Sequence, residues 1–128
     1  MNKPYDLTYL DQVFQGNSTL VGQIVTLFLQ QAPQLSQRMV SAVEANQWGD
    51  LHPLAHKLKS SVKMLGLREV LPVVVEIERV SKHREEPSAL PHLVGVLLVS
   101  LRHACDALSD EWVGQQAGTT RWPVLRRA

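Results

Sequence analysis

The longest apolar pattern in the chain follows Asn17 and Ser18, a pair that predicts a helix cap. Beyond this cap, apolar residues recur at steps of three and four, which places them on one face of an α-helix. They are Leu20, Ile24, Leu27, Phe28, Leu35, Met39 and Val43. The pattern predicts an amphipathic helix of about twenty-five residues. Pro33 falls inside this helix and predicts a kink or a local break.

The same spacing predicts three further helices, and a short helix at residues 7–14 precedes the long one. The first of these three further helices begins after a turn at 46–49, and Gly66 stands where that helix is expected to end. Its apolar residues are Leu51, Leu54, Ala55, Leu58, Val62 and Leu65. The next helix spans residues 68–83 and tolerates Pro72 only near its first turn. Its inward residues are Val70, Leu71, Val74, Ile77 and Val80. The last helix carries Leu90, Leu93, Val94, Leu97, Leu101, Cys105 and Leu108.

The order of these elements predicts an all-α fold. Four sizeable helices with short connections are typical of an antiparallel four-helix bundle, here with a short extra N-terminal helix. We assign residues 1–112 to this bundle domain and expect residues 113–128 to form a mobile basic tail. The tail contains Arg121, Arg126 and Arg127 but no acidic residue. A binding role for these arginines is the alternative.

Composition narrows the class of protein. The chain has 128 residues, 45% of them hydrophobic and 20% charged, which is typical of one globular domain. Its formal net charge of +1 gives nucleic-acid binding no support. The single cysteine, Cys105, lies in an apolar helical pattern and is interpreted as core packing. The apolar stretch at 93–101 is short for a membrane span, and no signal peptide is visible. We therefore expect a cytoplasmic protein that does not enter a membrane.

One histidine stands on the polar side of the helix that ends at Gly66. The helical neighbours of His56 are His52, Pro53, Lys59 and Ser60, with Lys57 beside them and Lys63 a turn further on. The opposite face of the helix is apolar. The pattern therefore predicts that His56 is exposed, which disfavours a core histidine. A histidine that is merely solvated on a helix surface remains the simplest alternative.

A metal site is another alternative, because His52 and His56 are spaced as two zinc ligands on one helix face. The intervening sequence lacks the glutamate of a metalloprotease motif, and no other histidine, cysteine or carboxylate is close in sequence. Pro53 threatens the helical geometry between the two histidines, and the surrounding lysines would repel a cation. We predict no metal site.

The stretch AHKLKSSVKMLGL resembles the signature of histidine-containing phosphotransfer (HPt) domains of bacterial two-component phosphorelays. The family pattern is Ala-His-x-Leu-Lys-Gly-Ser followed by a later glycine. The matching residues are Ala55, His56, Leu58, Lys59, Ser61, Gly66 and Leu67, and Ile77–Glu78 resembles a second piece of the pattern. Ser60 departs from it by replacing the usual glycine. Serine is also small, so a partner should still reach the imidazole.

The resemblance implies that His56 is the phosphoacceptor. A neutral imidazole is a good nucleophile near neutral pH, and its Nε2 atom can attack an aspartyl phosphate. Positive charge should stabilise the transferring group, for which Lys59 is the best candidate, and Ser60 could add a hydroxyl donor. By resemblance, Glu78 would accept a hydrogen bond from Nδ1–H and orient the histidine. Glu76 is its local competitor for that role.

Residues around this core are assigned to partner docking: Lys57, Ser61, Lys63 and Gly66. Receiver domains hold their phosphorylated aspartate in an acidic, Mg²⁺-binding cleft, so a basic helix face would steer toward it. For Lys57 and Lys63, plain solvation is an equally good explanation.

These features predict a phosphorelay intermediate. It would accept a phosphoryl group from a receiver-domain aspartate on His56 and pass it to the receiver of another response regulator. The expected partners are receiver domains of response regulators and of a hybrid sensor histidine kinase, with a monomeric carrier. No glycine-rich phosphate loop is visible, so we expect a phosphocarrier without ATP-binding or autokinase activity rather than an enzyme. We expect no cofactor, because Mg²⁺ would belong to the partner receiver. The alternative is a non-phosphorylated helical adaptor that binds or sequesters a receiver.

Overall fold

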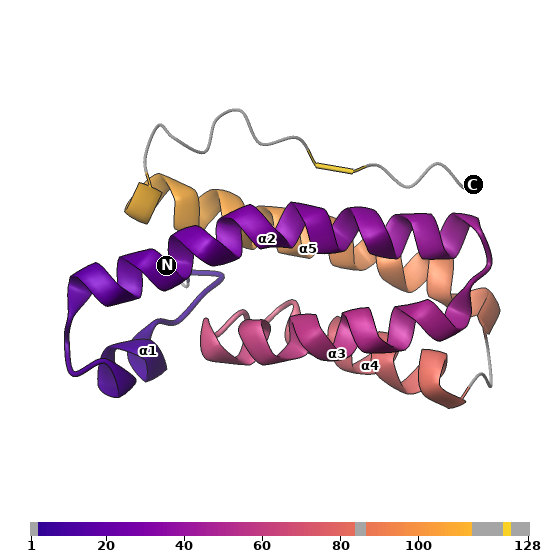
Figure 1. Ribbon diagram of the computed structural model, residues 1–128, viewed down its shortest axis with the longest axis horizontal. Helices are drawn as coiled ribbons and strands as arrows, with labels where there is room; N and C mark the ends of the chain where they lie inside the picture. The colour runs from indigo at the N-terminus through magenta and orange to yellow at the C-terminus, as the bar shows by residue number, and fades with distance from the viewer. Residues whose placement is uncertain (1–2, 84–86, 114–121, 124–128) are drawn as a thin grey trace.

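A computed structural model describes residues 3–83, 87–113 and 122–123 (Figure 1). Its helices are α1 (Thr8–Val13), α2 (Ser18–Glu44), α3 (Trp48–Met64), α4 (Leu71–His83) and α5 (Leu90–Leu108). A 3₁₀ turn, Pro87–Ala89, precedes α5, and a π turn, Ser109–Val113, follows it. No strand occurs within these described ranges. The predicted all-α class and the helical bundle are confirmed.

The four longer helices pack in a ring. α2 contacts α3 and α5, and α4 contacts the same two helices from the other side. The chain reverses direction at each connection between successive long helices (Figure 1). Large apolar side chains from all four helices are buried where they meet, and they include Met39, Leu51, Leu58, Ile77, Leu97 and Leu101. Burial of each such side chain stabilises the fold by about 1.5–3 kcal/mol before the loss of chain entropy is counted.

Helix α2 begins where the cap predicts and continues without interruption. The side chain of Asn17 accepts a hydrogen bond from the backbone N–H of Leu20 at 3.2 Å. The helix then runs for 27 residues through Pro33, so the predicted local break is wrong. Proline cannot donate the backbone bond that a helix interior normally makes. Buried side chains on both sides of Pro33 hold the helix together, among them Phe28, Ala32, Leu35 and Met39.

The connection between α3 and α4 is shaped by the N-terminal segment. Gly66 follows α3 with a φ of +62°, and the Asp6 backbone N–H donates to the Leu65 carbonyl at 3.1 Å. A Cβ atom at Gly66 would collide with the backbone of Asp6. Residues 68–70 form turns, so α4 starts at Leu71 rather than at the predicted residue 68. Pro72 lies in the first turn, as expected.

The N-terminal segment ties two parts of the bundle together. Tyr5, Leu7 and Leu10 are buried in the core. Arg68 donates to the carbonyl of Lys3, and the Lys3 ammonium pairs with Glu111 at 3.1 Å. This segment therefore links the end of α3 to the turn that follows α5.

Helix α5 is a core helix of the bundle. The segment Pro87–Glu111 is long and apolar enough to cross a membrane by length and composition, but the core helix of a bundle passes the same test. Its buried residues are Leu90, Val94, Leu97, Leu98, Leu101, Ala104, Cys105 and Leu108. Burial raises the pKa of the Cys105 thiol to about 12, so the core-packing interpretation of Cys105 is confirmed.

Most of the predicted tail at 113–128 lies outside the described residues, including Arg121, Arg126 and Arg127. Trp122 is described, and it is partly buried against the hydrophobic core.

Candidate functional site

His56 projects from the outer side of α3. Ala55, Leu58 and Val62 on the same helix are fully buried, and this anchoring fixes the rotation of α3 about its axis. The side chain of His56 is 66% exposed. The predicted exposure is confirmed, and a core histidine is excluded.

Glu78 on α4 holds one nitrogen of this histidine. Its Oε2 atom lies 2.7 Å from Nδ1 of His56, and its side chain is only 16% exposed. The neighbouring Ile77 is fully buried and anchors this turn of α4 against the core. Glu76, the local competitor, instead accepts a hydrogen bond from Nε of Arg79 at 2.6 Å. The contact across the two helices therefore belongs to Glu78.

Lys59 binds the other oxygen of the same carboxylate. Its ammonium lies 2.6 Å from Oε1 of Glu78, and its side chain is 22% exposed. Glu78 thus bridges the imidazole of His56 and the ammonium of Lys59. Lys59, which the sequence predicts to stabilise a phosphoryl group, is one helical turn from His56. In the structure its ammonium binds Glu78.

The charge on Glu78 sets the tautomer of the histidine. The hydrogen bond from Lys59 is the largest influence and lowers the pKa of Glu78, burial opposes it, and the hydrogen bond from His56 lowers it further. The net shift is downward, so the carboxylate stays ionised at neutral pH. A carboxylate only accepts hydrogen bonds, so Nδ1 carries the ring proton. When the imidazole is neutral, Nε2 then presents a lone pair for nucleophilic attack.

His52 lies one turn before His56 and is half-buried. The two rings are nearly parallel, with an angle of 23° between their planes and 6.3 Å between their centroids. In the described part of the chain, no three His, Cys, Asp or Glu side chains are grouped to hold a metal ion. The spacing that suggested a metal pair thus places a second imidazole beside the first.

The remaining predicted residues lie along α3 and just beyond its end. Ser60, Lys57 and Lys63 are exposed, and Ser61 is half-buried. Gly66 lies at the far end of α3, where its contact with Asp6 explains why glycine is needed. Its docking role stays a prediction.

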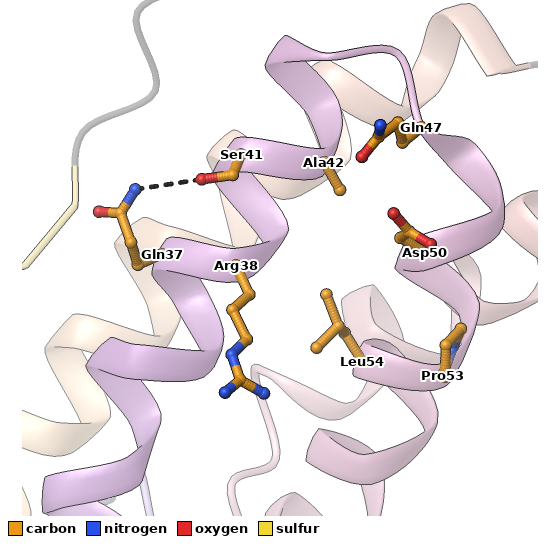
Figure 2. A pocket seen from close by; sticks show the side chains of 8 residues that line it. All are labelled: Gln37, Arg38, Ser41, Ala42, Gln47, Asp50, Pro53 and Leu54. Carbon is orange, nitrogen blue, oxygen red and sulfur yellow. Dashed lines mark hydrogen bonds between the residues drawn. The ribbon is translucent and has the colours of Figure 1, made fainter.

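A groove runs along the seam between α2 and α3, and sequence reasoning missed its α2 wall. One hollow of about 430 Å³ is lined by Gln37, Arg38, Ser41, Ala42, Gln47, Asp50, Pro53 and Leu54 (Figure 2). A second is lined by Gln31, Gln34, Leu35, Arg38 and Lys57, and a third by Ile24, Leu27, Phe28, Gln31, Ser61, Met64 and Leu65. Shared residues join the three hollows, which we call the α2–α3 groove. Arg38 and Gln31 look like ordinary polar positions in the sequence, because only the packing of the two helices brings them next to α3.

The fold and this site define a class of protein: a helical bundle that presents an exposed histidine whose Nδ1 atom is held by a carboxylate. A family model for the Hpt domain matches residues 23–111. The match covers more than half of the chain, so the chain belongs to the Hpt domain family. No curated protein and no solved structure matches it significantly.

Membership gives the chain a coarse role. Hpt domains are phosphocarriers of two-component systems, and they interact with receiver domains in phosphorelays. The resemblance carried by the AHKLKSSVKMLGL stretch is thereby confirmed.

Proposed function

We propose that this protein is a phosphorelay intermediate that accepts a phosphoryl group on Nε2 of His56 from a receiver-domain aspartate and passes it to another response regulator. The observation that carries this proposal is the contact of 2.7 Å between Nδ1 of His56 and the largely buried carboxylate of Glu78. A histidine that was merely solvated would not need an ionised partner on one nitrogen while the rest of its ring faces solvent.

The transfer step requires no separate base. The lone pair of Nε2 attacks the phosphorus of an aspartyl phosphate, an N–P bond forms, and the acyl P–O bond breaks. The partner aspartate leaves as a carboxylate, and no proton has to leave Nε2. The ring becomes more positive as the N–P bond forms, and Glu78 beside Nδ1 stabilises that charge. The reverse sequence passes the group to the next aspartate.

Lys59 and Ser60 support the phosphoryl group in this proposal. Phosphoryl transfer spreads negative charge over the equatorial oxygens, and positioned cations contribute most of the catalysis. The ammonium of Lys59 is fixed by Glu78 close to the ring and can share its remaining N–H groups with those oxygens. Ser60 is exposed on the same side of α3, where its small side chain leaves room for the partner.

The α2–α3 groove extends the docking surface beyond His56. Lys57 and Ser61 both line it, while Lys63 adds an exposed cation on α3. Exposed apolar side chains at one end, Leu27 and Met64, offer the contact area that a transient signalling interface uses. A receiver that covers Ser60 would bring its acidic cleft over this basic surface.

The expected partners are receivers of response regulators and of a hybrid sensor histidine kinase. The carrier itself would be a cytoplasmic monomer without a cofactor, and Mg²⁺ would enter with the receiver. It would not use ATP, and its role would be that of a substrate-like carrier rather than an enzyme.

The test is phosphoryl transfer from a panel of phosphorylated receiver domains to the wild type and to His56→Gln. We expect acid-labile, base-stable label on the wild type alone. A receiver that binds both proteins equally but labels neither would instead support a non-phosphorylated adaptor.

A further inference from the structure

His52 is an ionisable side chain that the proposed transfer step does not use. It lies on the same side of α3 as His56, with the two ring centroids 6.3 Å apart. Side chains on a helix lean toward its N-terminus, so the ring of His56 leans toward the turn that carries His52. A phosphoryl group attached to His56 would add its oxygens to this neighbourhood.

A further cation beside His56 would stabilise its phosphorylated form. A phosphoryl group brings about two negative charges. Lys59 lies one turn from His56, and the carboxylate of Glu78 already binds its ammonium at 2.6 Å. The two largely cancel each other, so the phosphorylated site would carry excess negative charge.

Other charged groups lie near the same end of the bundle. Asp50 is in the first turn of α3, and Lys82 and His83 are in the last turn of α4. In Figure 1 the start of α3 and the end of α4 share one end of the molecule. His52 differs from these groups because its ring lies beside the ring of His56.

We propose that His52 is a second positioning residue for phosphorylated His56: its imidazolium pairs with the phosphoryl group and makes storage of that group dependent on pH. This inference rests on the proposed function. The proton comes from solvent, and the N–H bond of the imidazolium is the one bond that forms at His52. An imidazole titrates near neutral pH, so its charge responds to small changes that leave lysines unaffected.

Linkage makes the proposal measurable. If protonated His52 favours phosphorylated His56, then phosphorylation must favour protonated His52 to the same extent. The negative charges of a phosphoryl group on the neighbouring ring should therefore favour the protonated form of His52.

The experiment is an NMR titration of the histidine rings before and after phosphorylation with phosphoramidate, a small-molecule phosphoryl donor. The buffer contains a chelator, which removes any contribution from a metal ion held by the two histidines. His103 is the matched control, because it is exposed and lies on α5, which packs mainly against α2 and α4. We expect the titration midpoint of His52 to rise by on the order of half a unit or more, and that of His103 to stay in place. Equal behaviour of the two histidines would overturn the inference.

Two variants test the same point through the relay. With a phosphorylated receiver as donor, His52→Gln should lower the equilibrium ratio of phosphorylated to free carrier by roughly 2- to 5-fold near pH 6.5. His52→Lys should restore that ratio and remove the part of its change between about pH 6 and 8 that depends on residue 52, because lysine stays charged throughout this range. A purely structural role would not produce this rescue.

The outcomes separate the two proposals. If His56 is phosphorylated and His52→Gln has the same ratio of phosphorylated to free carrier as the wild type, the role of His52 is overturned and the proposed function stands. If neither phosphoramidate nor any receiver modifies His56, the proposed function fails and the role of His52 fails with it.

Discussion

At the scale of single residues, the site depends on one carboxylate that serves two partners. Glu78 accepts from Nδ1 of His56 with one oxygen and from Lys59 with the other, at 2.7 and 2.6 Å. The same interaction that orients the proposed nucleophile therefore keeps a cation within reach of it.

Replacing Glu78 by Gln should slow phosphoryl acceptance at least about 10-fold, because an amide neither stabilises the positive ring nor fixes one tautomer as strongly. Rapid-quench kinetics with a phosphorylated receiver measures this rate. Glu76→Gln is the matched control, since its carboxylate pairs with Arg79 and not with the histidine. Equal rates in the two variants would contradict the assigned role.

Glu78 should also make stability depend on pH. Its pKa is lowered in the folded protein, with Lys59 as the first cause, so the unfolded chain binds this proton more readily. The contribution of the carboxylate to stability is therefore fully present above the ordinary pKa of glutamate. It is lost as the pH falls through the lowered pKa of Glu78 in the folded protein. We expect the free energy of unfolding of the wild type to exceed that of Glu78→Gln by about 1 kcal/mol at neutral pH. This difference should disappear in acid. Urea unfolding at both pH values measures the gap, and a gap that widened in acid would contradict this assignment.

The sequence could predict His56 more securely than its partner. Apolar spacing at Ala55, Leu58 and Val62 is enough to orient His56 outward. The choice of Glu78 over Glu76 depends on how α4 is rotated against α3, and local sequence does not encode that rotation. Only the family resemblance favoured Glu78 in advance. The engagement of Lys59 by the same carboxylate had no sequence signal.

At the scale of elements, helix existence follows the apolar pattern, while helix ends depend on tertiary contacts. The cap at Asn17 and the stop at Gly66 could be read from local chemistry. The continuity of α2 through Pro33 and the start of α4 at Leu71 could not. Packing along α2 decides the first of these features, and the crossing of the N-terminal segment over Gly66 decides the second. Both are long-range effects.

Gly66→Ala should destabilise the protein by about 2 kcal/mol or more, because an alanine at positive φ is strained and its Cβ would also strike the backbone of Asp6. Gly16→Ala is the matched control. Its φ is +78°, but a Cβ there meets nothing within 4 Å, so only the conformational cost of about 1 kcal/mol applies. Chemical denaturation of both variants gives the comparison. Equal losses would show that the Asp6 contact contributes nothing.

At the scale of the whole molecule, the bundle explains two features that the linear sequence leaves ambiguous. The apolar helix α5 is a core element whose inner residues are covered by α2 and α4. The α2–α3 groove joins residues that are distant in the chain, such as Arg38 and Lys57. Neither the covering of α5 nor the groove follows from periodicity alone, because each needs the relative placement of helices.

Cys105 reports on this packing, since it is the single cysteine and lies on the buried side of α5. Its thiol pKa of about 12 leaves almost no thiolate at pH 8. We expect iodoacetamide to label the native protein at least about 100-fold more slowly than the same protein in guanidinium, because labelling must await opening of the bundle. Native labelling at the rate of a free thiol would mean that α5 is not packed inside.

The proposed function depends most directly on His56 carrying the phosphoryl group. The most direct measurement is the intact mass of the protein after mixing with a phosphorylated receiver, followed by peptide mapping under basic conditions that preserve phosphohistidine. We expect a gain of one phosphoryl group, located on His56 in the wild type and absent from His56→Gln. Phosphorylation on another residue, or an unchanged gain in the variant, would contradict it.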